Sequence, residues 1–156
     1  MQLKVRTRHQ SKVDDSVFFT VRTLNLIQRA RRDAANLDGR QKYTEAVSAQ
    51  SSLVDDVVPR ALRGEQERIK TWTEKATPDQ NRRLDELADR EATLRYSIII
   101  PMVLGAALVT IEGLMADSKQ IITVEDFIEH APDALINEAF ELCQKASGLT
   151  DDQQKN

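Results

Sequence analysis

The longest apolar stretch of this sequence constrains the fold more than any other feature. It covers residues 98–109 and reads Ile-Ile-Ile-Pro-Met-Val-Leu-Gly-Ala-Ala-Leu-Val. Twelve uncharged residues are too few to cross a bilayer, which takes about 20. Pro101 and Gly105 lie inside the stretch. We therefore expect a buried central helix that is kinked and that meets another backbone closely at its small residues.

Apolar side chains three and four residues apart predict helices before this stretch. The first covers residues 14–36, and Gly39 then supplies a C-terminal stop. A second helix covers residues 41–58, and Thr77-Pro78 begins a third as its N-cap and first turn. The predicted apolar stripe of the first helix consists of Val17, Val21, Leu24 and Ile27.

Two shorter helices are predicted in the C-terminal third. Thr123 caps the first of them, which ends at His130, and Pro132 begins the second. A turn at residues 117–120 precedes them, and Ile121-Ile122 is a candidate for a brief strand. The predicted apolar stripe of the last helix consists of Leu135, Ile136, Ala139, Phe140 and Cys143.

These patterns predict an all-α fold, a small helical bundle that forms a single domain over residues 1–156. The chain has only 5 Gly and 4 Pro, which argues against a β-sandwich or barrel because those folds use many Gly and Pro turns. Residues 3–8 alternate apolar and basic side chains, so segment 1–13 is expected to be a loose arm or a short edge strand. Residues 60–83 are almost wholly polar and form either an exposed helix plus loop or a mobile link that depends on a partner.

Charge is distributed unevenly along the chain. Residues 1–40 carry a net charge of +5, residues 41–110 carry −1, and residues 111–156 carry −7. Opposite charge at the two ends favours head-to-tail self-association. The basic end also suits phosphate, but Phe18 and Phe19 follow an apolar stripe rather than the arginines, so nucleic acid is a weak alternative.

The chemistry-bearing residues do not form a catalytic pattern. Neither His9 nor His130 has another His or Cys three or four residues away, and no Gly-rich phosphate loop is present. Cys143 lies on an apolar stripe and is expected to be a small buried hydrophobic residue. We therefore predict a protein that is not an enzyme and that uses no metal and no cofactor. A single Cys and a polar, basic start without a cleavable signal are typical of a cytosolic chain.

The C-terminal part of the sequence resembles a known family over roughly residues 94–156. The similarity rests on Leu108-Val-Thr-Ile-Glu-Gly-Leu, the turn that begins at Ala116-Asp-Ser-Lys-Gln, the Pro-led segment from Ala131 and the ending Ser147-Gly-Leu-Thr-Asp-Asp-Gln-Gln-Lys-Asn. In this order the segments resemble the tail assembly chaperones of long-tailed bacteriophages and prophages. The basic opening followed by an Arg-rich helix is more loosely compatible with the same family.

The resemblance implies a chaperone that binds the long helical tape-measure protein in the bacterial host cytoplasm. Such a protein keeps the tape-measure protein soluble, helps recruit tail-tube subunits, and leaves before the virion is complete. Two alternatives stay open: a structural minor tail or connector protein of a phage, and a helical nucleic-acid-binding or regulatory protein. We expect no membrane partner.

Partner-binding residues are expected on the basic helix, at the single Trp and on the C-terminal helices. Arginine and tryptophan are frequent anchors of protein interfaces, and apolar side chains beyond those needed to close the core would form a groove-binding surface. The predicted set consists of Arg22, Arg29, Arg32, Trp72, Phe127, Ile128, Leu135 and Phe140.

Overall fold

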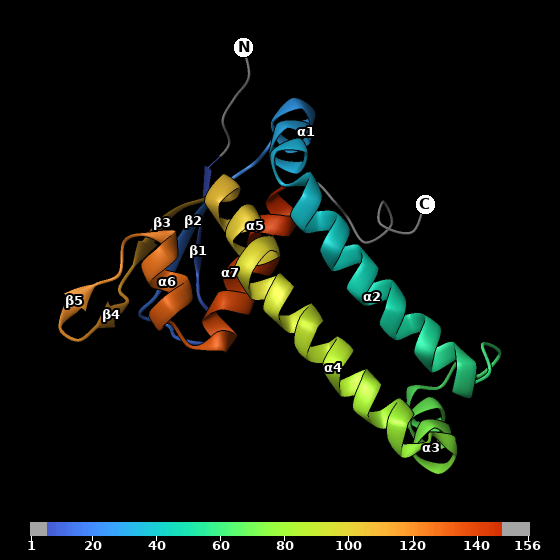
Figure 1. Ribbon diagram of the computed structural model, residues 1–156. Helices are drawn as coiled ribbons and strands as arrows, with labels where there is room; N and C mark the ends of the chain where they lie inside the picture. Colours follow the sequence, from blue (N-terminus) through green and yellow to red (C-terminus); the bar gives the residue numbers. More distant parts are fainter. Residues whose placement is uncertain (1–5, 148–156) are drawn as a thin grey trace. The chain divides into compact units, whose positions relative to one another are not determined.

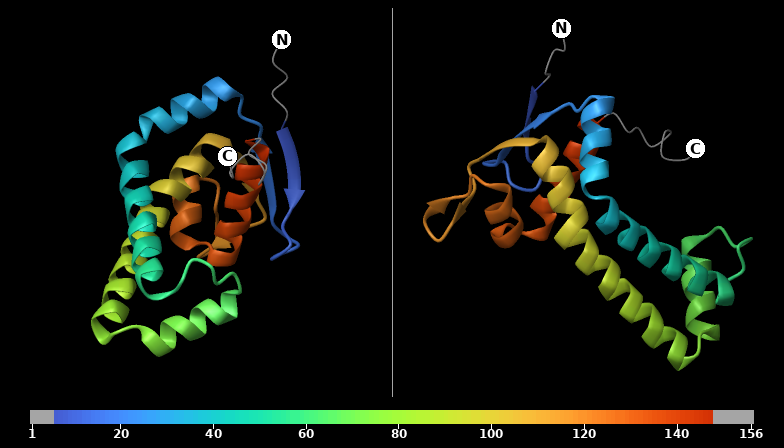
Figure 2. Two further views of the ribbon diagram at one scale, coloured as in Figure 1. Left: turned by 90° about the vertical axis from the view of Figure 1, so that its right-hand side faces the viewer. Right: turned by 45° about the horizontal axis from the view of Figure 1, so that its top comes forward.

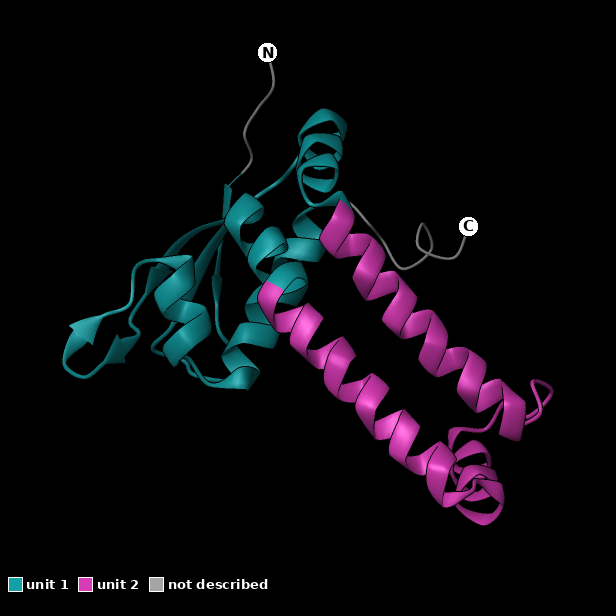
Figure 3. Cartoon of the chain, in the orientation of Figure 1, with its two compact units in different colours: residues 1–37, 98–156 teal, residues 38–97 magenta. Residues whose placement is uncertain are grey.

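The structure of the protein is a computed structural model that describes residues 6–147 (Figure 1). The chain folds as two compact units (Figure 3): residues 38–97 form unit 2, and the segments on either side, residues 1–37 and 98–156, form unit 1. The predicted single domain is thus organised as two units, with unit 2 inserted in the sequence of unit 1.

Unit 1 contains a three-stranded antiparallel sheet. Its strands, in spatial order, are β1 (Arg6–Gln10), β2 (Phe18–Arg22) and β3 (Leu108–Glu112). A short antiparallel ribbon, β4 (Met115–Ala116) and β5 (Lys119–Gln120), follows β3. The predicted all-α fold is therefore wrong, because the protein combines helices with two sheets. The edge strand that we considered for the N-terminal segment is present as β1.

The error arises where two periodicities overlap. Val17, Phe19 and Val21 alternate along the chain, and all three are buried. Such alternation is the mark of a strand with one covered face, but the same segment also matches the three- and four-residue steps of a helix. Residues 18–22 form a strand because their backbone pairs with both β1 and β3. The predicted helix over 14–36 is therefore wrong in its first half. The helix in this region, α1 (Leu26–Ala35), begins only after Asn25, its N-cap.

Helices cover one face of the sheet (Figure 2). They are α5 (Ile100–Ala107), α6 (Val124–His130) and α7 (Asp133–Ala146). Phe127 of α6 packs edge-to-face on Phe19 of β2, with ring centroids 5.7 Å apart. The predicted apolar stripe of α7 is confirmed, because all five of its side chains are buried. The predicted cap of α6 is also confirmed, since the Thr123 hydroxyl accepts a hydrogen bond from the Asp126 amide at 3.1 Å.

The long apolar stretch is divided between three kinds of backbone. Residues 95–99 form a π-helical turn, η1 (Arg95–Ile99), α5 follows, and the chain enters β3 at Leu108. Pro101 has no N–H to offer the carbonyl four residues earlier, and this mismatch explains the widened turn ahead of it. The prediction of one buried helix over 98–109 therefore holds only for residues 100–107.

Unit 2 consists of α2 (Leu37–Val57), α3 (Glu65–Lys75) and α4 (Pro78–Leu94). Helices α2 and α4 run antiparallel, side by side (Figure 3), and the Gln50 side-chain amide donates to the Leu87 carbonyl at 3.0 Å. The predicted start of the third helix is confirmed, because Thr77 caps α4 and a proline occupies its first turn. Gly39 was predicted to end a helix. This prediction is wrong, because Gly39 lies inside α2.

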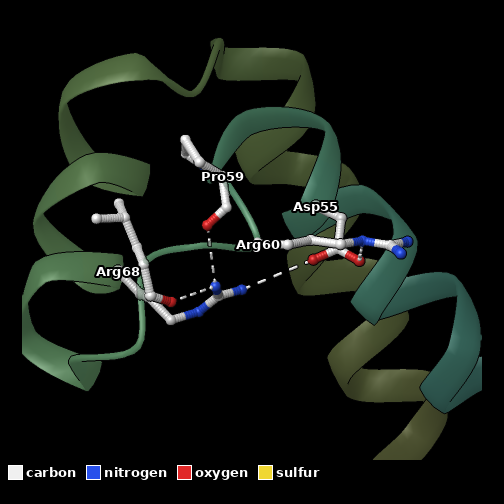
Figure 4. A network of polar contacts seen from close by, with 5 residues as sticks. Asp55, Pro59, Arg60 and Arg68 are labelled. Carbon is white, nitrogen blue, oxygen red and sulfur yellow. Dashed lines mark hydrogen bonds and ion pairs between the residues drawn. The ribbon is translucent and has the colours of Figure 1, made fainter.

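The polar stretch 60–83 contains α3 and a network that ties the preceding loop (Figure 4). The Arg68 guanidinium donates to the carbonyls of Leu62 at 3.0 Å and Pro59 at 3.4 Å, and lies 3.7 Å from the Asp55 carboxylate. Arg60 binds the same carboxylate at 2.9 Å. The buried apolar residues of unit 2 are few, namely Ala46, Val58 and Leu87, and polar contacts of this kind add to its small core.

Candidate protein-binding surface

The predicted partner-binding residues of the C-terminal helices lie mostly in the interior of unit 1. Phe127 is fully buried, and Leu135 and Phe140 are buried beside it in the core. Ile128 is half-buried. The surplus of apolar side chains on α6 and α7 is therefore largely consumed in closing the core against the sheet.

Trp72 and Arg22 both form contacts within their own units. Trp72 is half-buried on α3, and its indole N–H donates to the Asn81 side-chain oxygen of α4 at 2.9 Å. Arg22 is in unit 1, at the end of β2, where its Nε donates to the Ala106 carbonyl at 2.6 Å. Both side chains therefore have a structural role in the fold.

The two remaining predicted residues, Arg29 and Arg32, lie on the inward side of α1. Both are half-buried, and the Arg32 guanidinium binds Asp33 at 2.8 Å. The Arg29 Nε is buried and has no hydrogen-bond partner within the described part of the chain. Gln28, on the same side, completes a capping box with Asn25. The polar side of α1 thus faces the protein.

The outward side of α1 is apolar. Leu26 is 73 % exposed and Ile27 59 % exposed, and Ala30 and Ala34 are exposed in line with them. At 100° per residue these four side chains span an arc of about 100°, roughly opposite the inward polar residues. We call them the α1 face. No residue of α1 is buried.

This orientation is the reverse of that expected for a surface helix, which directs its apolar stripe to the core. Arg31 is exposed at the border of the α1 face, so a cation flanks the apolar residues. An arrangement of exposed aliphatic side chains with an arginine at the rim suits the binding of an amphipathic partner helix. It provides no nucleophile, acid or base.

Titratable side chains also gather around a hollow in unit 1. A hollow of about 350 Å³ between the β4–β5 ribbon and α6 is lined in part by Asp117, Lys119, Asp126 and His130. Within residues 6–147, no three side chains among His, Cys, Asp and Glu are placed to hold a metal ion. Burial raises the pKa of the Cys143 thiol to about 12, so this thiol is not a nucleophile near neutral pH.

Leu26 is the most exposed large side chain of the α1 face, and it is not among the predicted partner-binding residues. Ile27 was predicted to be part of a buried stripe, because the helix was expected to begin near residue 14. The signal that could have corrected this is the capping box, in which Asn25 stands three residues before Gln28. A helix that begins at Leu26 has its own apolar arc, which the longer predicted helix concealed.

No helix among the described residues has the length and apolar character needed to span a membrane. No family model, no curated protein and no solved structure matches this chain.

Proposed function

We propose that this protein is an assembly chaperone that binds a helical segment of a client protein through the α1 face. The observation that carries the proposal is the exposure of Leu26 and Ile27 on a helix whose polar side faces inward. Burying one such side chain contributes about 1.5–3 kcal/mol. A surface that leaves two of them side by side in water is typical of an interaction site.

The α1 face suits a helical client. Ten residues of helix are about 15 Å long, which matches two to three turns of a partner helix. The alanines at positions 30 and 34 allow a close approach of the two backbones, and Arg31 at the rim favours a client with acidic side chains beside its apolar stripe.

The resemblance of residues 94–156 to phage tail assembly chaperones suggests the class of client. A tape-measure protein is long and helical, and it needs a binding partner in the bacterial host cytoplasm until tail-tube subunits cover it. We propose that this chain has that role and leaves before the virion is complete. The nucleic-acid alternative is less favoured, because two of the arginines that prompted it, Arg29 and Arg32, face inward.

The test is co-expression with the candidate tape-measure protein, the product of a very long helical reading frame downstream of this gene. The chain is expected to raise the soluble fraction of that protein. Leu26→Asp combined with Ile27→Asp should abolish the effect and weaken binding at least about 100-fold, since about 3 kcal/mol or more of apolar burial is lost. Acids in the first turn of a helix are favoured, so the variant should fold normally.

Ile69→Asp is the matched control, because Ile69 is 53 % exposed on α3 and its substitution changes the same chemistry outside the α1 face. The control should bind the client as the natural chain does. Equal insolubility of the tape-measure candidate with and without this chain would refute the proposal. Presence of the chain in purified virions would instead favour a structural minor tail or connector protein.

A further inference from the structure

The two sides of unit 1 carry opposite charges. The sheet has one face covered by α5, α6 and α7 and one face that no helix among the described residues of unit 1 covers (Figure 2). Because side chains alternate along a strand and the register of the sheet is known, the residues of the uncovered face can be assigned. We call this surface the open sheet face; its principal residues are Arg6, Arg8, Phe18, Thr20 and Glu112.

Arg8 is held in place at the centre of the open sheet face. Its guanidinium lies 3.7 Å from the centroid of the Phe18 ring and 2.8 Å from the Glu112 carboxylate. Its side chain nevertheless remains 54 % exposed. A fixed and exposed cation loses little conformational entropy when it meets an anion. Arg6, also exposed, lies on the same face two residues away.

The opposite side of unit 1 is acidic. Helix α6 directs Phe127 into the core, and its outward side, together with the start of α7, carries four exposed carboxylates. We call this surface the α6 face; it consists of Glu125, Asp126, Glu129 and Asp133. Glu125 and Asp126 suit the first turn of α6, but Glu129 is in the last turn, where the helix dipole disfavours an acid. Helix stability therefore does not explain it.

We propose that the open sheet face binds a second copy of this chain, which docks with its α6 face. The argument is charge complementarity between two surfaces that every copy presents on opposite sides of one unit. Such a contact is heterologous, so each copy keeps one surface free and the association can repeat. Pairing of two β1 edges is disfavoured instead, because it would place the arginines of both copies side by side.

The first measurement is sedimentation velocity of the full chain at 0.1 M and 1 M NaCl. The screening length falls from about 10 Å to about 3 Å between these conditions. The weight-average mass is expected to rise with protein concentration at low salt and to stay at 17.7 kDa, that of the monomer, at high salt. The proposal would be overturned if the protein is a monomer at every concentration in low salt. It would also be overturned if the oligomers persist unchanged at 1 M NaCl.

Two variants identify the surfaces. The sheet variant is Arg6→Gln with Arg8→Gln, and the helix variant is Glu125→Gln with Glu129→Gln. Each variant alone should remain monomeric, because one of its two surfaces is lost. Their equimolar mixture should form a one-to-one dimer and nothing larger, since only one productive pair of surfaces remains. A mixture that stays monomeric, or variants that still form oligomers, would contradict the assignment.

Arg8 also contacts Phe18 and Glu112, so circular dichroism must show that the sheet variant is folded. Arg6→Glu alone repeats the test at the exposed end of β1 without changing Arg8. Arg83→Glu, an exposed site on α4, is the matched control and should associate like the natural chain. The Leu26→Asp and Ile27→Asp variant should also still associate, because α1 takes no part, so this proposal and the client-binding proposal can fail separately.

Discussion

Phe127→Ala distinguishes a core residue from a partner-binding residue. The side chain is fully buried and packs edge-to-face on Phe19, with an angle of 71° between the rings. Truncation of a buried Phe costs about 3–5 kcal/mol, from lost apolar burial and the cavity that remains. The aromatic pair contributes about 0.5–1.5 kcal/mol of this. Because the total stability of a domain is about 5–15 kcal/mol, the variant should fold but unfold much more easily.

The assay is urea denaturation followed by far-UV circular dichroism, with melting as a second readout. For a chain of this size each kcal/mol shifts Tm by about 2–4 °C, so a decrease of about 6–20 °C is expected. Phe127→Leu keeps most of the volume and should cost less than Phe127→Ala. Ile122→Ala is the surface control, because Ile122 is 68 % exposed and its truncation should change stability by no more than about 0.5 kcal/mol.

If Phe127→Ala lowers the free energy of unfolding by less than about 1 kcal/mol, the packing described for α6 on β2 is refuted. The refutation would be complete if the same variant lost client binding at unchanged stability, because Phe127 would then be an interface residue. The expected result is the converse, in which client affinity measured well below the melting temperature is preserved.

Three further predictions test other contacts of unit 1. Gly113→Ala should prevent normal folding of the sheet, because the backbone is at φ +80° and the added Cβ would lie 2.0 Å from the Ser16 carbonyl oxygen; thermal melting measures this. Glu138→Gln should lower stability by about 1–3 kcal/mol in urea denaturation, because it weakens the charged hydrogen bond, 2.5 Å long, that Glu138 accepts from the buried Ser11 hydroxyl. Cys143 should react with iodoacetamide at pH 8 at least about 10-fold more slowly than an ordinary thiol, since burial raises its pKa to about 12 and little thiolate is present.

Each of these predictions has a control variant or a measurable outcome that would contradict it. Gly105→Ala should be tolerated, because nothing lies within 4 Å of the added Cβ, and equal melting of the two Gly variants would contradict the turn geometry. Glu141→Gln changes an exposed carboxyl on the same helix and should leave stability unchanged. Rapid alkylation of Cys143 in the native protein would show that the thiol is accessible. Because the folded pKa is raised, burial of this thiol favours the folded state below about pH 9 and loses that effect as pH rises toward 12.

Local signals in the sequence predicted structure correctly where each signal fits only one kind of backbone. Thr77 with Pro78, and Thr123 before two acids, mark helix starts because a hydroxyl accepts the free amides of a first turn. The stripe of α7 was also correct, since five apolar side chains at helical spacing over 14 residues do not fit a strand. The functional surface was harder to predict, because the same apolar side chain serves a core or an interface according to what it faces.

The sequence alone determined that the apolar stripe of α7 must be buried, where α4 and α6 begin, and that charge is separated along the chain, because these depend on residue type and on neighbours within one turn. Only the tertiary structure decided that residues 18–22 and 108–112 are strands, since their backbones gain hydrogen bonds from each other across some 90 residues of sequence. It also decided that α1 directs Arg29 and Arg32 inward and Leu26 outward. Periodicity defines two sides of a helix, and only the packing of the whole unit selects the one that faces water.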